Sequence, residues 1–444
     1  MTITIIIAAH NEEHRITDAL HSLAEQTRPA DTVIVICDRC TDGTAELAES
    51  YGARVLHTVG NTHRKAGALN QALMTVLPSL ADTDSVLMMD ADTALAQDFL
   101  AIAEERVTCG TFAVGAIFLA EATDTFGVTA LQRNEYLRYA HDLHRRHARA
   151  EVISGTAGLF PVHALREIVD GRRGGKLPGE GCWPAGRGCS GYVYSLRALT
   201  EDNELTMAAK YLGYKAASPD GCTVVTEVMP TLKTLFYQRL RWQRGALSTL
   251  RDYGLTRTTL PYFIRQVLMY LGIMFFPFFV TVIVHAVIET GRFPWSWPWF
   301  FASLLLIVER VWTVRAGGLR ALILAILVLP EIVYDMFQHY VLLRAGVDEL
   351  VRSDEHWDHA EAQDGGREKR WWPWLFIPAA TMLACLAAVL CIWLEVQWIV
   401  IGVIVASGIA HACLRATPLD PLVLVYGSYQ LACRGCQHGG WEGD

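Results

Sequence analysis

Charged residues are scarce in this chain. Aspartate, glutamate, lysine and arginine make up 19% of its 444 residues, whereas 52% of the residues are hydrophobic. Because this balance is too apolar for an ordinary soluble protein, we expect part of the chain to lie in lipid. The net charge of −8 gives no support to nucleic-acid binding, which requires basic surfaces.

Two local patterns are missing as well, a secretory signal and a zinc-binding cluster. The chain begins with the apolar run of residues 1–7, without a basic region or a small-residue cleavage site. We therefore expect the first part of the chain to stay in the cytoplasm. The eleven cysteines are scattered, and the pairs Cys37/Cys40 and Cys433/Cys436 lack a companion pair. This favours reduced structural thiols over a zinc site.

Apolar runs and helical spacing alternate along the first 90 residues. The alternation implies a parallel sheet with helices on both faces. In such sheets the ligand crevice lies at the carboxyl ends of the strands, where His10, Asp38 and Asp90 fall. The expected strands are residues 3–9, 33–37, 54–58 and 85–89, and the expected helices are residues 12–26, 44–51 and 66–77.

Residues 115–250 predict further helices and loops. The expected helices are residues 132–149, residues 200–212, and residues 235–250, which are aromatic and basic and suit a helix at a membrane surface. Residues 154–158 and the glycine- and arginine-rich stretch 171–191 predict loops.

Long uncharged runs appear only after residue 255. Residues 266–288 carry no charge and are long enough to cross a hydrocarbon core of ~30 Å. Residues 295–314 are the next candidate, and residues 320–343 could cross, re-enter or lie at the interface. With an apolar hairpin near the carboxyl terminus, residues 373–394 and 396–412, the sequence predicts four or five spans.

Taken singly, the polar motifs have simple structural explanations. A carboxylate pair such as Asp90 and Asp92 in a loop is more often a solvated turn or a helix cap than a metal site. Trp242, which stands between two arginines, could anchor a helix at a membrane interface. Three other residues could each cap the helix that follows them: Asn11, Asp42 and Asp202.

The order of the motifs changes this interpretation. The six motifs are Ala8-Ala9-His10-Asn11-Glu12-Glu13, Asp38-Arg39-Cys40-Thr41-Asp42-Gly43-Thr44, Lys65-Ala66-Gly67-Ala68-Leu69-Asn70, Asp90-Ala91-Asp92, Thr200-Glu201-Asp202 and Gln238-Arg239-Leu240-Arg241-Trp242. In this order they resemble the motifs of the family 2 glycosyltransferases, especially the processive branch that includes cellulose, chitin, hyaluronan and poly-N-acetylglucosamine synthases. The resemblance covers roughly residues 3–250.

The resemblance implies which residues hold the nucleoside of the donor. The strand end that contains Ala8, His10 and Glu12 would hold the uridine base together with Asp38. Lys65 would lie near the nucleotide. His10 replaces the family's usual tyrosine, which keeps base stacking but changes its polarity.

The resemblance also implies how the diphosphate is bound. Asp90 would contact the nucleotide, and Asp92 would bind Mg²⁺ or Mn²⁺ that bridges the two phosphates. Such a cation neutralises the negative charge that builds up as the diphosphate departs. Gln238 and Arg241 resemble the part of the QxxRW signature in which a guanidinium fork meets phosphate oxygens.

The remaining implied roles concern the acceptor. Asp202 would be the catalytic base, because an inverting displacement needs a carboxylate within reach of the acceptor hydroxyl. Gly155, Thr156 and Glu201 would contact the acceptor, and the indole of Trp242 would stack against its sugar. The glycine loop departs from the family's pattern, because Pro161 stands where a basic residue is expected.

The sequence therefore predicts an α/β fold, a Rossmann-like nucleotide-sugar-binding domain of glycosyltransferase A type followed by an α-helical transmembrane region. The catalytic domain would lie in the cytoplasm and the protein would be a multi-pass protein of the cell membrane. The expected segments are a catalytic domain (residues 1–232), an interface helix with the QxxRW motif (233–260), transmembrane or interfacial helices (261–343), a polar linker (344–371), a transmembrane hairpin (372–412) and a tail (413–444).

The expected activity is processive, inverting transfer from a UDP-sugar to a growing polysaccharide with β-linkages. No span precedes the catalytic domain, so a translocation channel would need the C-terminal spans, an oligomer or a small membrane partner. The alternative is transfer of a single sugar onto a lipid or polyprenyl phosphate. A transporter or a scaffold that only senses nucleotide sugars is a third hypothesis, in which Glu309, Arg310, Glu331 and Asp335 line a pathway.

Overall fold

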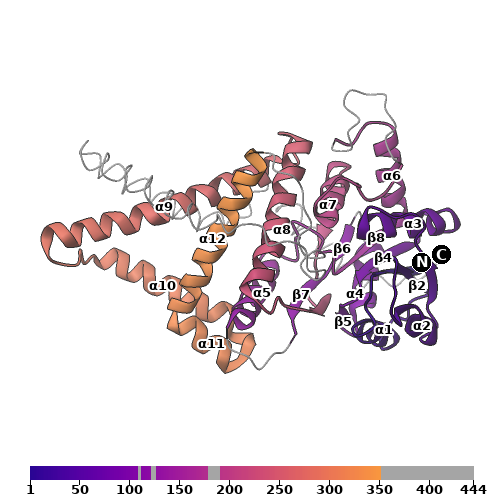
Figure 1. Ribbon diagram of the computed structural model, residues 1–444, viewed down its shortest axis with the longest axis horizontal. Helices are drawn as coiled ribbons and strands as arrows, with labels where there is room; N and C mark the ends of the chain where they lie inside the picture. The colour runs from indigo at the N-terminus through magenta and orange to yellow at the C-terminus, as the bar shows by residue number, and fades with distance from the viewer. Residues whose placement is uncertain (109–111, 122–126, 179–190, 352–444) are drawn as a thin grey trace, which may run out of the picture. The chain divides into compact units, whose positions relative to one another are not determined.

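The computed structural model describes residues 1–108, 112–121, 127–178 and 191–351 (Figure 1). The expected hairpin, the tail and most of the linker lie outside the described residues. The chain divides into two compact units, Met1–Phe263 with Pro298–Arg367, and Ile264–Trp297 with Glu368–Asp444. The first unit contains every residue expected at the catalytic site.

A seven-stranded sheet with the order β3-β2-β1-β4-β8-β6-β9 organises the first unit. The strands are β1 (Ile3–Ala9), β2 (Thr32–Cys37), β3 (Arg54–His57), β4 (Ser85–Asp90), β6 (Phe112–Gly115), β8 (Ala157–Pro161) and β9 (Lys215–Ala217). A smaller sheet joins β5 (Ala94–Leu95), β10 (Thr223–Thr226) and β7 (Ile117–Ala120) in that order.

The large sheet is mixed, with parallel and antiparallel pairs of strands. The first four strands pair in parallel, as predicted. Strand β8, which lies beyond the residues for which a parallel sheet was expected, runs antiparallel to both β4 and β6, whereas β6 and β9 pair in parallel. The loop expected at residues 154–158 ends before Ala157, where β8 begins, because the small residues Ala157 and Gly158 fit a buried strand. A Cβ on Gly158 would lie 2.8 Å from the Ile153 side chain.

Alternate residues of β1 face two separate cores, because successive side chains of a strand point to opposite faces. Ile6 packs in one core with α3 (Arg64–Val76), α6 (Val162–Arg173) and α7 (Glu201–Tyr211). Ile5 and Ile7 pack in the other core with α1 (Ile16–Ala24), α2 (Thr44–Ser50) and α4 (Phe99–Thr108). Figure 1 shows these two sets of helices on either side of the strands. The helices predicted on both faces of the sheet are therefore confirmed.

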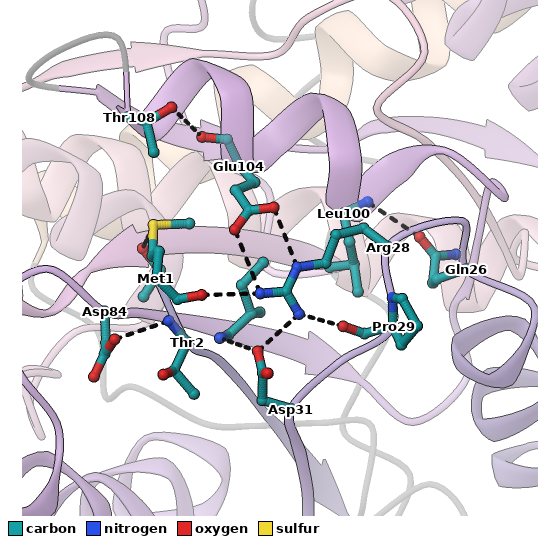
Figure 2. A network of polar contacts seen from close by, with 12 residues as sticks. Met1, Thr2, Gln26, Arg28, Pro29, Asp31, Asp84, Leu100, Glu104 and Thr108 are labelled. Atoms are coloured by element: carbon teal, nitrogen blue, oxygen red, sulfur yellow. Dashed lines mark hydrogen bonds and ion pairs between the residues drawn. The ribbon is translucent and has the colours of Figure 1, made fainter.

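A polar network fastens the amino-terminal end of β1 (Figure 2). Arg28 pairs with Asp31 at 2.7 Å and with Glu104 at 3.1 Å, and it donates to the Met1 carbonyl at 3.0 Å. The Ile3 amide donates to Asp31 at 2.8 Å. This hydrogen bond lowers the pKa of Asp31. Burial acts to raise that pKa, and the hydrogen bond and charge of Arg28 lower it further. The network holds the edge of the sheet opposite to the candidate site.

The remaining helices of the catalytic region agree with the sequence to within a few residues. They are α5 (Val128–Arg145), α7 and α8 (Leu232–Tyr253). Thr231 caps α8, because its hydroxyl accepts a hydrogen bond from the Thr234 amide at 3.2 Å. Two short 3₁₀ turns complete the set, η1 (Leu77–Ser79) and η2 (Arg315–Gly317).

Up to residue 351, where the described part of the chain ends, four helices follow α8, namely α9 (Leu260–Thr290), α10 (Trp297–Thr313), α11 (Gly318–Leu327) and α12 (Leu329–Leu350). Among the described residues, α9 alone is long and apolar enough to cross a membrane by itself. The segment Arg315–Leu327 and α12 would pass only as a pair, and they meet at a bend of 80°. Val328, at the bend, has a left-handed φ of 58°.

Helix α12 is joined to the catalytic region by ion pairs. The carboxylate of Glu331 is buried and forms ion pairs with Arg310 of α10, at 2.8 Å, and with Arg138 of α5. It also accepts a hydrogen bond from the Asn134 side chain of α5 at 3.1 Å. Arg310 also pairs with Asp335. Three of the four charged residues of the transport hypothesis, Arg310, Glu331 and Asp335, therefore form ion pairs among themselves, and Glu331 also pairs with α5.

Candidate active site

The carboxyl ends of β1, β2 and β4 lie side by side. Ala8 is in register with Ile36 of β2 and with Asp90 of β4. His10 directly follows β1, and Asp38 directly follows β2. Because register decides which residues meet across a sheet, four of the expected donor-binding residues are gathered at one edge.

Asp38 is buried at this edge and is oriented by its neighbours. Its Oδ1 accepts a hydrogen bond from Thr58 Oγ1 at 2.8 Å and lies 3.8 Å from Arg39 Nε. His10 Nδ1 lies 2.5 Å from the carbonyl oxygen of Asp38. Since a carbonyl only accepts, His10 Nδ1 carries the proton, and the ring is held against the end of β2.

Side chains tie the loops after β1 and β2 to each other. Asn11 has a left-handed φ of 56°, and its Oδ1 accepts a hydrogen bond from the Thr41 amide at 2.8 Å. The Glu12 amide donates to Thr44 Oγ1 at 2.8 Å. Two of the expected motifs therefore form one connected platform, beside which His10 is exposed.

None of the three residues for which capping was expected occupies the N-cap position of its helix. The N-cap of α2 is Gly43, although Asp42 Oδ1, one residue earlier, accepts a hydrogen bond from the Thr44 amide at 3.2 Å. Helix α1 begins beyond Asn11, whose side chain binds the neighbouring loop instead. The N-cap of α7 is Thr200, so Asp202 lies inside the first turn.

Lys65 connects the donor residues with the acceptor residues. Its Nζ lies 2.5 Å from Asp90 Oδ1 and 3.5 Å from Glu201 Oε1. It also donates to the Gly155 carbonyl at 3.2 Å. Burial would lower the pKa of Lys65, but the charges of Asp90 and Glu201 outweigh it and raise the pKa. The ammonium group therefore stays charged.

Asp202 faces the glycine loop from the first turn of α7. Its Oδ2 accepts from the Gly155 amide at 3.0 Å, and its Oδ1 accepts from the Asn203 amide at 2.8 Å. A Cβ on Gly155 would lie 3.1 Å from Lys65 Nζ and 3.3 Å from Asp202 Oδ2, so glycine permits this close approach. Burial and then the charge of Glu201 raise the pKa of Asp202. The shift makes this carboxylate a better proton acceptor.

Glu201 and Thr156 lie beside these residues. Burial would raise the pKa of Glu201, but the charges of Lys65 and Arg241 outweigh it and lower the pKa. Glu201 therefore stays ionised while its neighbour in the sequence becomes more basic. The Thr156 carbonyl accepts from the Asp90 amide at 3.0 Å, which fixes the glycine loop against the end of β4.

Helix α8 carries Gln238, Arg241 and Trp242 and packs against the start of α7. A Cβ on Gly245 would lie 2.1 Å from Thr200 Oγ1, so this approach requires glycine. Arg241 lies about one turn before Gly245. Its charge acts on both acidic residues at the start of α7.

The other two QxxRW residues point to different surroundings. The guanidinium of Arg239 lies 4.4 Å from the centre of the Trp242 ring and pairs with Glu135 of α5 at 3.0 Å. Trp242 is thus connected to α5, whereas Arg241 is connected to α7. Gln238 Oε1 is buried and has no hydrogen-bond partner among the described residues. A ligand donor at this position would satisfy it.

Crowded carboxylates surround the end of β4. Burial, and then the charges of Asp92 and Asp90, raise the pKa of Glu12 to about 7. Burial raises the pKa of Asp90 to about 6, against the opposing charge of Lys65. Asp92 accepts a hydrogen bond from Thr93 Oγ1 at 3.2 Å. The raised pKa values show that negative charge is costly here without a cation.

The acidic pair can hold a cation only together with other ligands. In the described part of the chain, no three histidine, cysteine, aspartate or glutamate side chains stand close enough to bind a metal by themselves. Mg²⁺ commonly takes one or two carboxylates and completes its shell with water and substrate phosphates. Asp90 and Asp92 are oxygen donors of the kind that Mg²⁺ and Mn²⁺ prefer, and they fit a cation that is shared with a diphosphate.

A family model described as glycosyltransferase-like family 2 matches residues 2–245. The chain belongs to this family. Its large sheet with flanking helices is the α/β fold that the sequence predicted for this part of the chain. The match identifies the family and not the processive branch.

The chain is similar to curated proteins over part of its length. It is 43% identical over 90 residues to 4,4'-diaponeurosporenoate glycosyltransferase of Staphylococcus aureus, covering 20% of this chain and 24% of that relative. The chain thus spans about a quarter of the length of the curated relatives that it matches.

Solved structures resemble it at low sequence identity. The mannosyltransferase PcManGT from Pyrobaculum calidifontis, in complex with GDP-Man and Mn²⁺, has a TM-score of 0.48 at 19% identity and covers 79% of this chain and 88% of its own. Glucosyl-3-phosphoglycerate synthase from Mycobacterium tuberculosis, in complex with Mg²⁺ and UDP, has a TM-score of 0.37 at 20% identity and covers 57% and 80%.

One residue of the glycosyltransferase site is absent from the sequence motifs. Tyr194 lines a pocket together with Lys65, Gly155 and Asp202. The side chain of Asn70, at the end of the Lys65 motif, binds the backbone of Tyr194 across 124 positions of the sequence. Asn70 was a visible signal, but its distant partner could not be identified from the sequence alone.

Proposed function

We propose that the chain transfers a sugar from a UDP-sugar with inversion, and that Asp202 is the general base. The observation that carries the proposal is the position of the Asp202 carboxylate, which lines a pocket with Gly155 and Lys65 and has a raised pKa. Asp202 takes the proton of an acceptor hydroxyl, while the oxygen of that hydroxyl bonds to the anomeric carbon. The bond between that carbon and the diphosphate breaks on the opposite face.

The uridine base would bind at the platform formed by the loops after β1 and β2. Asp38 is fixed by Thr58 and can accept the imide N–H of uracil, which cytosine lacks. The small side chain of Ala8 leaves space at the strand end, and the exposed ring of His10 offers a stacking surface. Glu12, with a pKa of about 7, can donate or accept near the ribose.

The diphosphate would lie between the end of β4 and helix α8. Asp92, assisted by Asp90, would hold Mg²⁺ or Mn²⁺, which neutralises the charge of the leaving diphosphate when bound. Arg241 and Gln238 approach from α8, and a guanidinium fork suits phosphate oxygens. The electrostatic effect of Arg241 on the start of α7 supports this placement.

The acceptor that we favour is a growing polysaccharide with β-linkages. In this proposal the Trp242 indole stacks on an acceptor sugar, and Gly155, Thr156 and Glu201 border the acceptor beside the base. A single transfer onto a lipid is the second candidate. The relative whose name gives 4,4'-diaponeurosporenoate as its substrate favours it.

We further propose that the enzyme works at the cell membrane with its catalytic domain in the cytoplasm. Helix α9 meets the length and hydropathy required for a span. Large apolar side chains on α10 and α11 are also exposed, among them Leu305 at 69%, Leu306 at 62% and Leu319 at 72%. Such a surface is stabilised by contact with lipid.

A donor screen tests the reaction. Purified full-length protein in lipid nanodiscs would be incubated with UDP-glucose, UDP-N-acetylglucosamine, GDP-mannose and related donors, with Mg²⁺, Mn²⁺ or EDTA, and nucleotide release would be measured. We expect metal-dependent release of UDP, and no release from any donor would contradict the proposal. Sizing of radiolabelled product separates the acceptors, because a ladder supports the polysaccharide and a single-sugar lipid supports the second candidate.

A further inference from the structure

Tyr194 lies on the chain between α6 and α7, outside every motif of the sequence. Its side chain is 5% exposed, and it lines the same pocket as Asp202, Gly155 and Lys65. Of the residues assigned to the donor and its cation, Asp38 and Asp92 do not line this pocket, and Lys65, which does, also donates to the carbonyl of Gly155 in the glycine loop. The pocket therefore belongs to the acceptor side of the site.

The backbone at Tyr194 is held from two directions. The Asn70 side chain accepts from the Tyr194 amide at 2.9 Å and donates to the Tyr194 carbonyl at 2.9 Å. Arg172, which forms a buried ion pair with Glu204 of α7 at 2.6 Å, donates to the Val193 carbonyl at 3.0 Å. Such restraint fixes where the tyrosine ring enters the pocket, because both neighbouring peptide groups are anchored.

The hydroxyl of Tyr194 is the part of this side chain that lacks a partner. It makes no hydrogen bond with any residue in the described ranges, although its backbone is fully bonded. Burial raises the pKa of Tyr194 against the opposing charge of Lys65, so the group keeps its proton. An O–H group that lies at a pocket and has no protein partner is available to donate to a ligand oxygen.

We propose that the Tyr194 hydroxyl donates a hydrogen bond to an oxygen of the acceptor and so directs the reacting acceptor hydroxyl toward Asp202. The inference rests on the proposed function. During transfer the proton of the reacting hydroxyl goes to Asp202, while Tyr194 keeps its own proton. Tyr194 is thus a substrate contact that sets acceptor affinity, and Asn70 is the positioning residue that holds it.

The variant Tyr194→Phe tests this contact, because it removes the hydroxyl and keeps the ring. We expect the KM for the acceptor to rise by about 5- to 15-fold, the change that corresponds to the loss of one hydrogen bond. The KM for the UDP-sugar and the slow hydrolysis of the donor without acceptor should stay within about twofold of wild type. Thermal unfolding checks that the fold is retained.

Tyr214→Phe is the matched control. Tyr214 is 8% exposed and belongs to the same core, but it lies outside the pocket. Its hydroxyl is bonded to Glu167, and burial, followed by that bond, raises its pKa. The control should lose some stability and keep the wild-type KM for the acceptor.

Three results would overturn the inference. An unchanged KM for the acceptor in Tyr194→Phe would show that the hydroxyl makes no contact. An equal loss of transfer and of donor hydrolysis would assign Tyr194 to the donor or to the fold instead. If the wild-type protein releases no UDP from any donor, the proposed function fails, and the inference fails with it.

Discussion

Replacing Asp202 with asparagine separates the base from the rest of the site. The Asp202 carboxylate accepts two backbone hydrogen bonds, from Gly155 at 3.0 Å and from Asn203 at 2.8 Å. Asparagine has the same shape but offers one accepting oxygen, so Asp202→Asn retains one of these bonds. The loss of the other bond costs about 0.5–1.5 kcal/mol of stability.

The loss of the base is larger than this structural cost. A positioned general base contributes roughly 10²- to 10⁴-fold, or about 3–5 kcal/mol of activation free energy. We therefore expect the kcat of Asp202→Asn to fall by at least 10²-fold. Binding of UDP with metal should change by less than about tenfold, because Asp202 contacts the glycine loop rather than the donor residues.

Asp84 provides a control with the same chemical change at the opposite edge of the sheet. It is buried and accepts backbone hydrogen bonds from Thr2 and Ala81, each at 2.8 Å. Asp84→Asn should lower the unfolding temperature about as much as Asp202→Asn and keep full turnover. Single-turnover kinetics and calorimetric titration of UDP measure the two effects. Turnover of Asp202→Asn within tenfold of wild type, or a parallel loss of UDP affinity, would refute the assignment.

Three other changes probe the metal, the position of α8 and acid stability. Asp92→Asn should weaken metal-dependent binding of UDP by roughly tenfold or more in calorimetry, and unaltered metal dependence would remove Asp92 from that role. The Cβ of Gly245→Ala would lie 2.1 Å from Thr200 Oγ1 and would push α8 away from α7, so kcat should fall by roughly 10²-fold. The control Gly272→Ala should be neutral, because nothing lies within 4 Å of its Cβ. Backbone hydrogen bonds, chiefly the one at the start of β1, lower the pKa of Asp84. Its contribution to stability is therefore present above the unfolded pKa of ~3.9 and lost as pH falls through the folded pKa. Unfolding temperatures from pH 7 to pH 3 should fall less steeply in Asp84→Asn, and identical slopes would contradict this.

The first half of the sheet could be predicted because each of its strands is a short run of large apolar residues between polar turns. Strands β1, β2 and β4 begin and end within a residue of the expected limits. Strand β8 could not be recognised in the same way, because Ala157-Gly158 is small and follows a glycine loop. Its antiparallel place between β4 and β6 depends on long-range packing that a local pattern does not contain.

The site was predictable to the extent that its residues stand in motifs. The strand register brings His10, Asp38 and Asp90 together as expected, because all three follow or end neighbouring strands. The contacts of Lys65 with two carboxylates were not predictable, since they join α3 both to the end of β4 and to Glu201, which lies more than a hundred positions away. Tyr194 was missed for the same reason.

Charge balance at the site explains why donor and cation would bind together. Five carboxylates are crowded at the site and are linked by electrostatic interactions with one another or with Lys65, namely Glu12, Asp90, Asp92, Glu201 and Asp202. Lys65 and Arg241 supply positive charge to this group, and Lys65 is already engaged by Asp90 at 2.5 Å. Two unit charges 4 Å apart repel by about 4 kcal/mol at an effective dielectric constant of ~20, so a bare diphosphate would be opposed by each nearby carboxylate. A divalent cation held by Asp92 would reverse the sign of this interaction, so we expect the affinity for UDP to depend on the cation.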